Sequence, residues 1–320
     1  VLGYHQPTEY ANEQEEALDK EFLAAFHAGK YEEIANFKAR FQALLPQNNQ
    51  TPPSPKVLAR LGFLNVWQFG ERYRGLEAKE QIADVQGLLQ SIGACSEYFR
   101  AAVAASPSNA VYRGFASICT MILGTSGAPG TESALAIGRE LAGSAIRRNP
   151  EFNLFTIGYI LSAQPVLIPD ERGKIIDNPD FELGVDMLWR NLDVCFDDTI
   201  DRKNPDVSKY IQGFLPLGNK RYCLNSEVSP HNFEGFFLIF GDVLVKANQP
   251  QAAKVMYANA KLLPSYQTWD AKFRAILDDR IANAAQLITP FRAPVNPFEK
   301  PEYPVITFDT EDNCMVCHKN

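Results

Sequence analysis

Positive charge is scarce in this chain. Its 31 lysines and arginines are outnumbered by 38 aspartates and glutamates, which gives a formal net charge of −7 and a pI of about 5.3. Proteins that grip a nucleic-acid backbone neutralise its phosphates with clustered cations. The balance therefore argues against nucleic acid as a partner and favours basic protein partners.

Long apolar runs and recognisable catalytic patterns are also missing. The longest apolar stretch, Phe236 to Val245, is interrupted by Gly241 and Asp242, and it is shorter than the ~20 residues that a membrane-spanning helix needs. We expect no membrane span in this chain. There is no phosphate-binding loop, H-E-x-x-H sequence or paired-carboxylate signature, so the sequence gives little support to an enzyme.

The overall composition is that of an ordinary globular protein. Hydrophobic residues make up 46% and charged residues 22%, which excludes a disordered, collagenous or coiled-coil chain. A length of 320 residues exceeds what one compact core usually holds, so we expect two subdomains or an elongated repeat architecture. No charged and apolar leader precedes Val1, and we expect either a processed chain, consistent with a removed signal or lipid anchor, or a trimmed one.

Residues 9–290 carry the pattern of amphipathic helices. In the segment from Glu9 to His27, apolar side chains recur at spacings of three and four, and they are Leu18, Phe22, Leu23 and Phe26. Prolines and glycines punctuate the pattern, and no useful run of alternating β-branched residues separates them. The sequence therefore predicts an all-α fold for a first domain of residues 1–290.

One window of this domain has the spacing of a helical repeat. Its small, aliphatic and aromatic positions are Gly241, Leu244, Ala253, Tyr257 and Ala260, with Pro264 closing it. Small residues let two antiparallel helices approach, and the aromatic ring fills the space between them. The window resembles the tetratricopeptide repeat family in degenerate form. Weaker copies occur around Gly29, Phe99 and Gly138.

The resemblance implies a solenoid of helical hairpins with a concave groove for peptides or proteins, and no chemistry of its own. A generic helical bundle in which alanines and aromatics recur by chance is the alternative.

The C-terminal residues 291–320 differ from the helical part of the chain in composition. Four prolines at spacings of three and four, from Pro294 to Pro304, keep this segment extended. It is also too rich in apolar residues for a plain linker. We expect an extended arm that packs either on the groove of its own chain or on a neighbouring subunit, with a brief strand at Val305 to Phe308.

The arm ends in the sequence Cys314-Met315-Val316-Cys317-His318. This C-x-x-C-H spacing resembles the haem-attachment site of c-type cytochromes. The resemblance implies one covalent haem c, with Cys314 and Cys317 as its thioether anchors and His318 as the proximal iron ligand. The competing interpretations are a zinc site, which lacks an obvious second pair of ligands, a thioredoxin-like redox pair, and a plain disulfide.

A distal iron ligand is harder to name. His231 follows Ser229-Pro230 before an apolar helix, which suits a ligand, although a helix-capping or surface role is favoured over it. The other candidates are His5, His27, Met121, Met187 and Met256, with the methionines expected in the core.

Haem attachment implies a periplasmic or extracellular location. There the remaining cysteines Cys95, Cys119, Cys195 and Cys223 can form two disulfides, with Cys95 and Cys119 a plausible pair; buried thiols are the alternative.

Two functions follow from these expectations. The first is a mono-haem c-type cytochrome on a helical-repeat scaffold, which transfers electrons or serves as the haem-bearing accessory subunit of an extracytoplasmic redox assembly. Its partners would be other redox proteins or subunits. The second is a structural protein whose arm, residues 291–320, docks into a neighbouring copy to form an oligomer or filament.

Overall fold

The computed structural model describes residues 10–47, 51–71, 85–216, 222–223, 232–293, 305 and 314–319. This part of the chain is predominantly helical, which confirms the all-α class. Within it, no helix is both long and apolar enough to cross a bilayer. The α-helices are α1 (Glu13–His27), α2 (Ile34–Ala43), α3 (Pro55–Gly70), α5 (Val85–Ala105), α6 (Ala110–Thr125), α7 (Ala134–Arg148), α8 (Pro150–Ser162), α9 (Pro179–Phe196), α10 (Ser208–Phe214), α11 (Phe233–Lys246), α12 (Pro250–Asn259), α13 (Ala271–Asn283), α14 (Ile288–Arg292) and α15 (Met315–His318). Short 3₁₀ helices are η1 (Tyr31–Glu33), η3 (Ala260–Leu262) and η4 (Pro264–Gln267).

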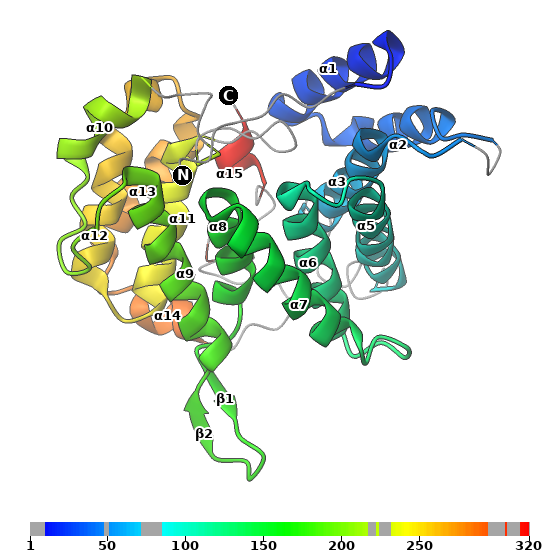
Figure 1. Cartoon of the computed structure of the whole chain (residues 1–320). Helices are drawn as coiled ribbons and strands as arrows, with labels where there is room; N and C mark the ends of the chain where they lie inside the picture. Colours follow the sequence, from blue (N-terminus) through cyan, green and yellow to red (C-terminus); the bar gives the residue numbers. More distant parts are fainter. Residues whose placement is uncertain are drawn as a thin grey trace.

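Helices that follow one another in sequence pack as pairs. The most extensive contacts join α3 to α5, α5 to α6, α6 to α7, α8 to α9, and α11 to α12. These pairs succeed one another around an arc, so that the first helices and the last helices face each other across its opening (Figure 1). We call α1–α3 the N-terminal arm and α11–α13 the C-terminal arm.

Glycines allow close approach where paired helices cross. A β-carbon at Gly241 of α11 would lie 2.1 Å from Cε1 of Tyr257 on α12, so the ring occupies the space that a side chain would need. Between α8 and α9, a β-carbon at Gly184 would lie 2.5 Å from the backbone nitrogen of Ser162. The small-against-aromatic contact expected at Gly241 and Tyr257 is therefore present.

The first helix buries the stripe read from its sequence. Leu18, Phe22 and Phe26 are buried, and the Asn12 side chain caps the helix by accepting from the backbone N–H of Glu15 at 2.9 Å. The helix begins at Glu13, four residues after the expected start at Glu9, because the Asn12 cap fixes where the helical hydrogen bonds begin.

Two short strands depart from the all-α prediction. Strand β1 (Leu167–Pro169) pairs antiparallel with β2 (Ile175–Asp177), and the hairpin projects from the helical body between α8 and α9 (Figure 1). Strands of three residues are too short to show a period of two, so the breakers at Pro165 and Pro169 were the visible signal here. The turn is set by the Asp170 carboxylate, which accepts from the backbone N–H of Lys174 at 2.8 Å.

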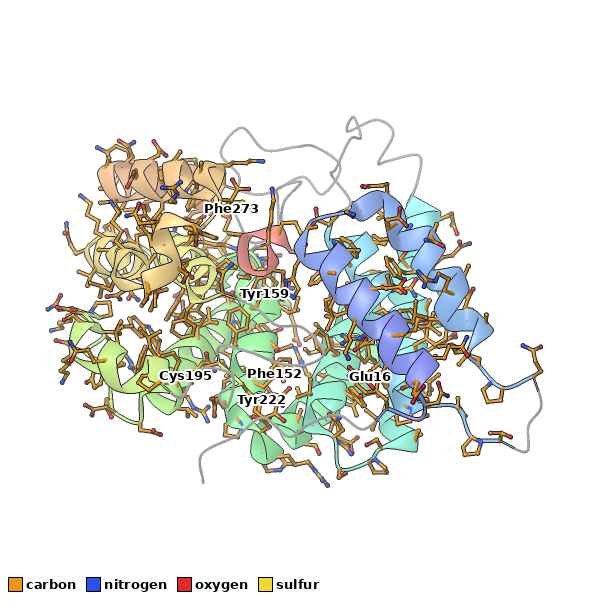
Figure 2. All side chains as sticks on the ribbon, turned by 90° about the horizontal axis from the view of Figure 1, so that it is seen from above. Glu16, Phe152, Tyr159, Cys195, Tyr222 and Phe273 are labelled. Carbon is orange, nitrogen blue, oxygen red and sulfur yellow. A yellow bond between two sulfur atoms is a disulfide. The ribbon has the colours of Figure 1, made fainter. Side chains whose placement is uncertain are left out.

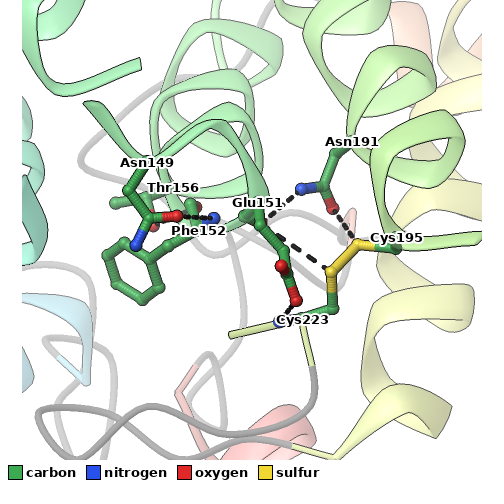
Figure 3. The surroundings of a disulfide bond; sticks show 7 residues. All are labelled: Asn149, Glu151, Phe152, Thr156, Asn191, Cys195 and Cys223. Atoms are coloured by element: carbon green, nitrogen blue, oxygen red, sulfur yellow. Dashed lines mark hydrogen bonds between the residues drawn. A yellow bond between two sulfur atoms is a disulfide. The ribbon is translucent and has the colours of Figure 1, made fainter. Parts of the chain in front are cut away.

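Four cysteines form two disulfides. Cys95 in α5 is bonded to Cys119 in α6, as the sequence suggested, and Cys195 in α9 is bonded to Cys223. Figure 3 shows the second bond beside Asn191, whose side-chain amide donates to the carbonyl oxygen of Glu151 at 2.7 Å. Each bond ties neighbouring elements of the arc together.

Candidate functional site

The last described residues, 314–319, form a single helical turn that lies between the two arms (Figures 1 and 2). We call them the tail turn. Helix α15 contacts α1 on one side and α11 on the other. The arm was expected to be extended from residue 291, but Phe291 and Arg292 belong to helix α14, because the first of the arm's prolines is Pro294. Residues 294–304, and most of the expected strand at 305–308, lie outside the described residues. The end of the segment 291–320, the tail turn, packs between the N-terminal and C-terminal arms of its own chain.

The N-terminal arm holds one side of the tail turn. The backbone N–H of Cys314 donates to Oε1 of Glu71 at 3.1 Å. The ring Nδ1–H of His27 donates to the carbonyl oxygen of His318 at 2.5 Å. Gly29 has a positive φ of 66°, and the Met315 sulfur would lie 3.3 Å from a β-carbon there. The C-terminal end of α1 and the residues just after it therefore pack directly against the tail turn.

The C-terminal arm holds the other side. The backbone N–H of Asn232 donates to the carbonyl oxygen of Cys317 at 2.6 Å, and the indole N–H of Trp269 donates to that of Val316 at 3.2 Å. Lys319 forms an ion pair with Asp270 at 2.8 Å, and this hydrogen bond lowers the pKa of Asp270. The carbonyl groups that a short helix leaves unpaired are thus satisfied by side chains and backbone of both arms.

Cys314 and Cys317 keep their thiols, since neither belongs to a disulfide. Their surroundings differ. Cys314 is half-buried against Gly70, whereas Cys317 is only 5% exposed and sits on Gly235 of α11. Burial raises the pKa of the Cys317 thiol, and the nearby carboxylate of Glu234 raises it further. The docked Cys317 is therefore a protonated, weakly reactive thiol.

The imidazole of His318 lies among aromatic rings of the N-terminal arm. Its ring centroid is 5.0 Å from that of Phe26, which also packs edge-on against Trp67 at 4.8 Å. The indole Nε1 of Trp67 is buried and has no hydrogen-bond acceptor among the residues that the structure describes. His27 completes the group, with its centroid 5.6 Å from Phe26. Two histidines therefore meet at this end of the tail turn.

The structure places the other candidate ligands elsewhere. Met121, Met187 and Met256 are buried in the helical core, as expected. His231 and His5 lie outside the described residues, so their positions stay predictions. Sequence reasoning did not select Glu71, Asn232 or Trp269, because each binds a backbone group of the tail turn and lies far from it in the chain.

Comparison with known proteins gives no relative. No family model, no curated protein and no solved structure matches this chain. Its function must therefore be argued from its own residues. The described ranges contain no group of three or more His, Cys, Asp or Glu side chains that could hold a metal ion.

The tail turn carries the types of side chain that the resemblance to a haem-attachment site requires. Two thiols three residues apart remain outside the disulfides, an imidazole follows the second, and the imidazole of His27 binds the backbone carbonyl of His318. Space is the limiting factor. The Cys317 sulfur is only 2.7 Å from where a β-carbon of Gly235 would be, so the docked turn leaves no room for a substituent on that sulfur from the α11 side.

Proposed function

We propose that this protein is a mono-haem c-type electron carrier, or the haem-bearing subunit of an extracytoplasmic redox assembly, built on a tetratricopeptide-like scaffold. The observation that carries the proposal is the division of the cysteines. Four of the six form disulfides within the helical body, and the two that keep their thiols are those of the C-x-x-C-H sequence. Disulfides persist in the oxidising compartments where covalent haem is installed, so both features point to the periplasm or the extracellular space.

The residues of the tail turn have distinct roles in this proposal. Cys314 and Cys317 anchor the haem covalently, and His318 is its proximal ligand. The bound haem would supply one-electron transfer at its iron. His27 is the distal candidate on the described part of the chain, because it already lies beside His318. Because Gly235 closes in the docked Cys317 on the α11 side, we expect the two thiols to be accessible for attachment before the turn docks.

The scaffold supplies the partner surface. The glycine and tyrosine contact between α11 and α12, and the successive pairing of helices, support a repeat-like solenoid. The net charge of −7 favours basic partners such as small soluble redox proteins.

Intact mass tests the haem directly. Protein produced in an oxidising compartment with haem-maturation machinery should carry the fixed increment of one haem, and a haem stain should survive denaturation. The double variant Cys314→Ser/Cys317→Ser should fold with its two body disulfides and carry no increment. A wild-type mass equal to that of the bare polypeptide would overturn the proposal.

A second function is favoured by the contacts of the tail turn alone. Because both arms bind it through hydrogen bonds, it can act as a clasp for a non-redox interaction scaffold, either in its own chain or in a neighbouring copy. Truncation should begin at residue 294, because Phe291 is buried and its ring stacks with Arg280.

Removing residues 294–320 should let the arms separate. Loss of the clasp in one chain should enlarge the radius of gyration measured by small-angle scattering, with the mass in solution reduced only by the deletion. If the tails are instead exchanged between copies, the truncation should convert an oligomer to a monomer. An unchanged radius and an unchanged assembly state would together contradict the clasp.

A further inference from the structure

The projecting hairpin exposes apolar side chains that the helical body leaves uncovered. Ile175 is 59% exposed, Leu167 47% and Ile176 37%, and the next exposed leucine, Leu183, lies in the first turns of α9 directly after the hairpin. A two-stranded ribbon is marginally stable by itself in water. Its exposed edges can accept a further strand.

The hydrogen bonds show which backbone groups face outward. The backbone N–H of Asp170 donates to the carbonyl oxygen of Lys174, and the backbone N–H of Asn178 donates to that of Val166, both at 2.8 Å. Bonded pairs alternate along an antiparallel ladder. The pairs Leu167–Asp177 and Pro169–Ile175 are therefore the non-bonded ones, and their N–H and C=O groups point away from the partner strand.

The two edges of the hairpin are not equivalent. On β1 the outward positions include Pro169, which has no N–H, so this edge cannot complete a ladder. On β2 the outward positions are Ile175 and Asp177, and both present a donor and an acceptor. Residues 174–177 are all exposed. Only the edge of β2 is ready to add a strand.

We propose that β2 pairs antiparallel with β2 of a second copy about a two-fold axis at Ile176. In this register Ile175 faces Asp177 of the other copy, and all the outward N–H and C=O groups of these two residues are satisfied. Ile176 pairs with Ile168 in its own hairpin, so the four strands bring two Ile168 and two Ile176 side chains into one row on one face. The contact is closed and symmetric, so it gives a dimer rather than a filament.

Charge favours the same arrangement. Antiparallel pairing centred on Ile176 runs Arg172 and Lys174 alongside residues 178–180 of the other copy. These basic residues approach the acidic first turn of α9, which contains Asp180 and Glu182. Asp180 also pairs with Arg139 of its own chain at 2.9 Å. The same charged hairpin tip opposes insertion into a lipid bilayer.

Sedimentation over a range of concentrations tests the dimer. So small an interface should be weak, and the wild-type protein should pass from monomer to dimer as its concentration rises toward about 100 μM. Ile176→Glu places two like charges on the axis, and Ile175→Pro removes an outward N–H without touching a bond of the hairpin. Each should weaken association at least tenfold. Leu262→Glu, an exposed leucine on η3, should leave it unchanged.

Cross-linking checks the register. Across the axis, Ile176 of the two copies forms a non-bonded pair, a geometry with Cα atoms about 4.5 Å apart that a disulfide can span. Ile176→Cys in the Cys314→Ser/Cys317→Ser background should therefore give a covalent dimer on oxidation, and Leu262→Cys should not. A wild-type monomer at every concentration, an Ile176→Glu dimer of undiminished affinity, or binding of the hairpin to lipid vesicles would overturn the proposal. None of these outcomes depends on haem, because haem loading is read separately by intact mass.

Discussion

Replacing Asp19 with alanine is expected to cost about 3–5 kcal/mol of unfolding free energy, the range for breaking a buried ion pair by removing one partner. Asp19 is fully buried on α1 and contacts two buried cations of α3, Arg60 through a hydrogen-bonded ion pair and Lys56 at 3.3 Å. The substitution leaves both cations in the interior without this carboxylate. Urea unfolding with the disulfides intact measures the loss.

A surface ion pair provides the matched control. Asp186 lies 3.7 Å from Arg190 one turn along α9, with both side chains exposed. Asp186→Ala should change the unfolding free energy by no more than about 0.5 kcal/mol. A loss below about 1 kcal/mol for Asp19→Ala would show that the buried cluster contributes little net stability.

The same cluster gives stability a dependence on pH. Burial alone would raise the pKa of Asp19, but Arg60 and Lys56 outweigh it and lower the pKa below its ordinary value of 3.8. The stabilisation is therefore fully present above pH 3.8 and is lost as the pH falls through the lower folded value. Asp19→Asn should flatten this acid limb in a titration of unfolding free energy.

The helical body could be read from the sequence because its signals are local. The apolar stripe of α1 and the glycine and tyrosine pair of α11 and α12 each lie within one or two helices. Cys95 and Cys119 occupy neighbouring helices, so their pairing needed little knowledge of the rest of the fold. The C-x-x-C-H spacing of Cys314, Cys317 and His318 was likewise visible in the sequence, and the haem that it implies stays a prediction.

The surroundings of the tail turn could not be read in this way. Trp269 and Asn232 donate hydrogen bonds to backbone carbonyl groups of the tail turn, which carry no residue-specific signal, and Glu71 is 243 positions away from Cys314. The hairpin escaped notice because its strands are too short for a period. The contacts of the tail turn depend on how the fold brings the two ends of the arc together, and this arrangement has no local signal in the sequence.

Gly235→Ala should displace the tail turn from its position against α11. A β-carbon there would lie 2.5 Å from the carbonyl oxygen of Val316, 2.7 Å from the sulfur of Cys317 and 2.8 Å from its Cα atom. Two of these are backbone atoms, so no side-chain rotation relieves the clash. In haem-free protein carrying Cys314→Ser, Gly235→Ala should raise the rate at which Cys317 reacts with a thiol reagent at least tenfold, because solvent exposure lowers its pKa.

A second helical glycine, Gly213, provides a control for the general effect of replacing glycine by alanine in a helix. Gly213 of α10 has nothing within 4 Å of its missing β-carbon. Gly213→Ala should leave the reactivity of Cys317 unchanged and stabilise the protein by up to about 1 kcal/mol, the difference in helix propensity. If Cys317 stays unreactive in Gly235→Ala, the tail turn is not held by this contact.

The Gly235 variant also distinguishes attachment of haem from docking of the turn. If the thiols react before the turn packs between the arms, Gly235→Ala protein made with haem-maturation machinery should carry the same haem increment in its intact mass as the wild type. If docking instead creates the attachment site, the increment should fall with the loss of docking. The first result is the one expected, because the docked Cys317 lies closed against α11, where a substituent on its sulfur has no space.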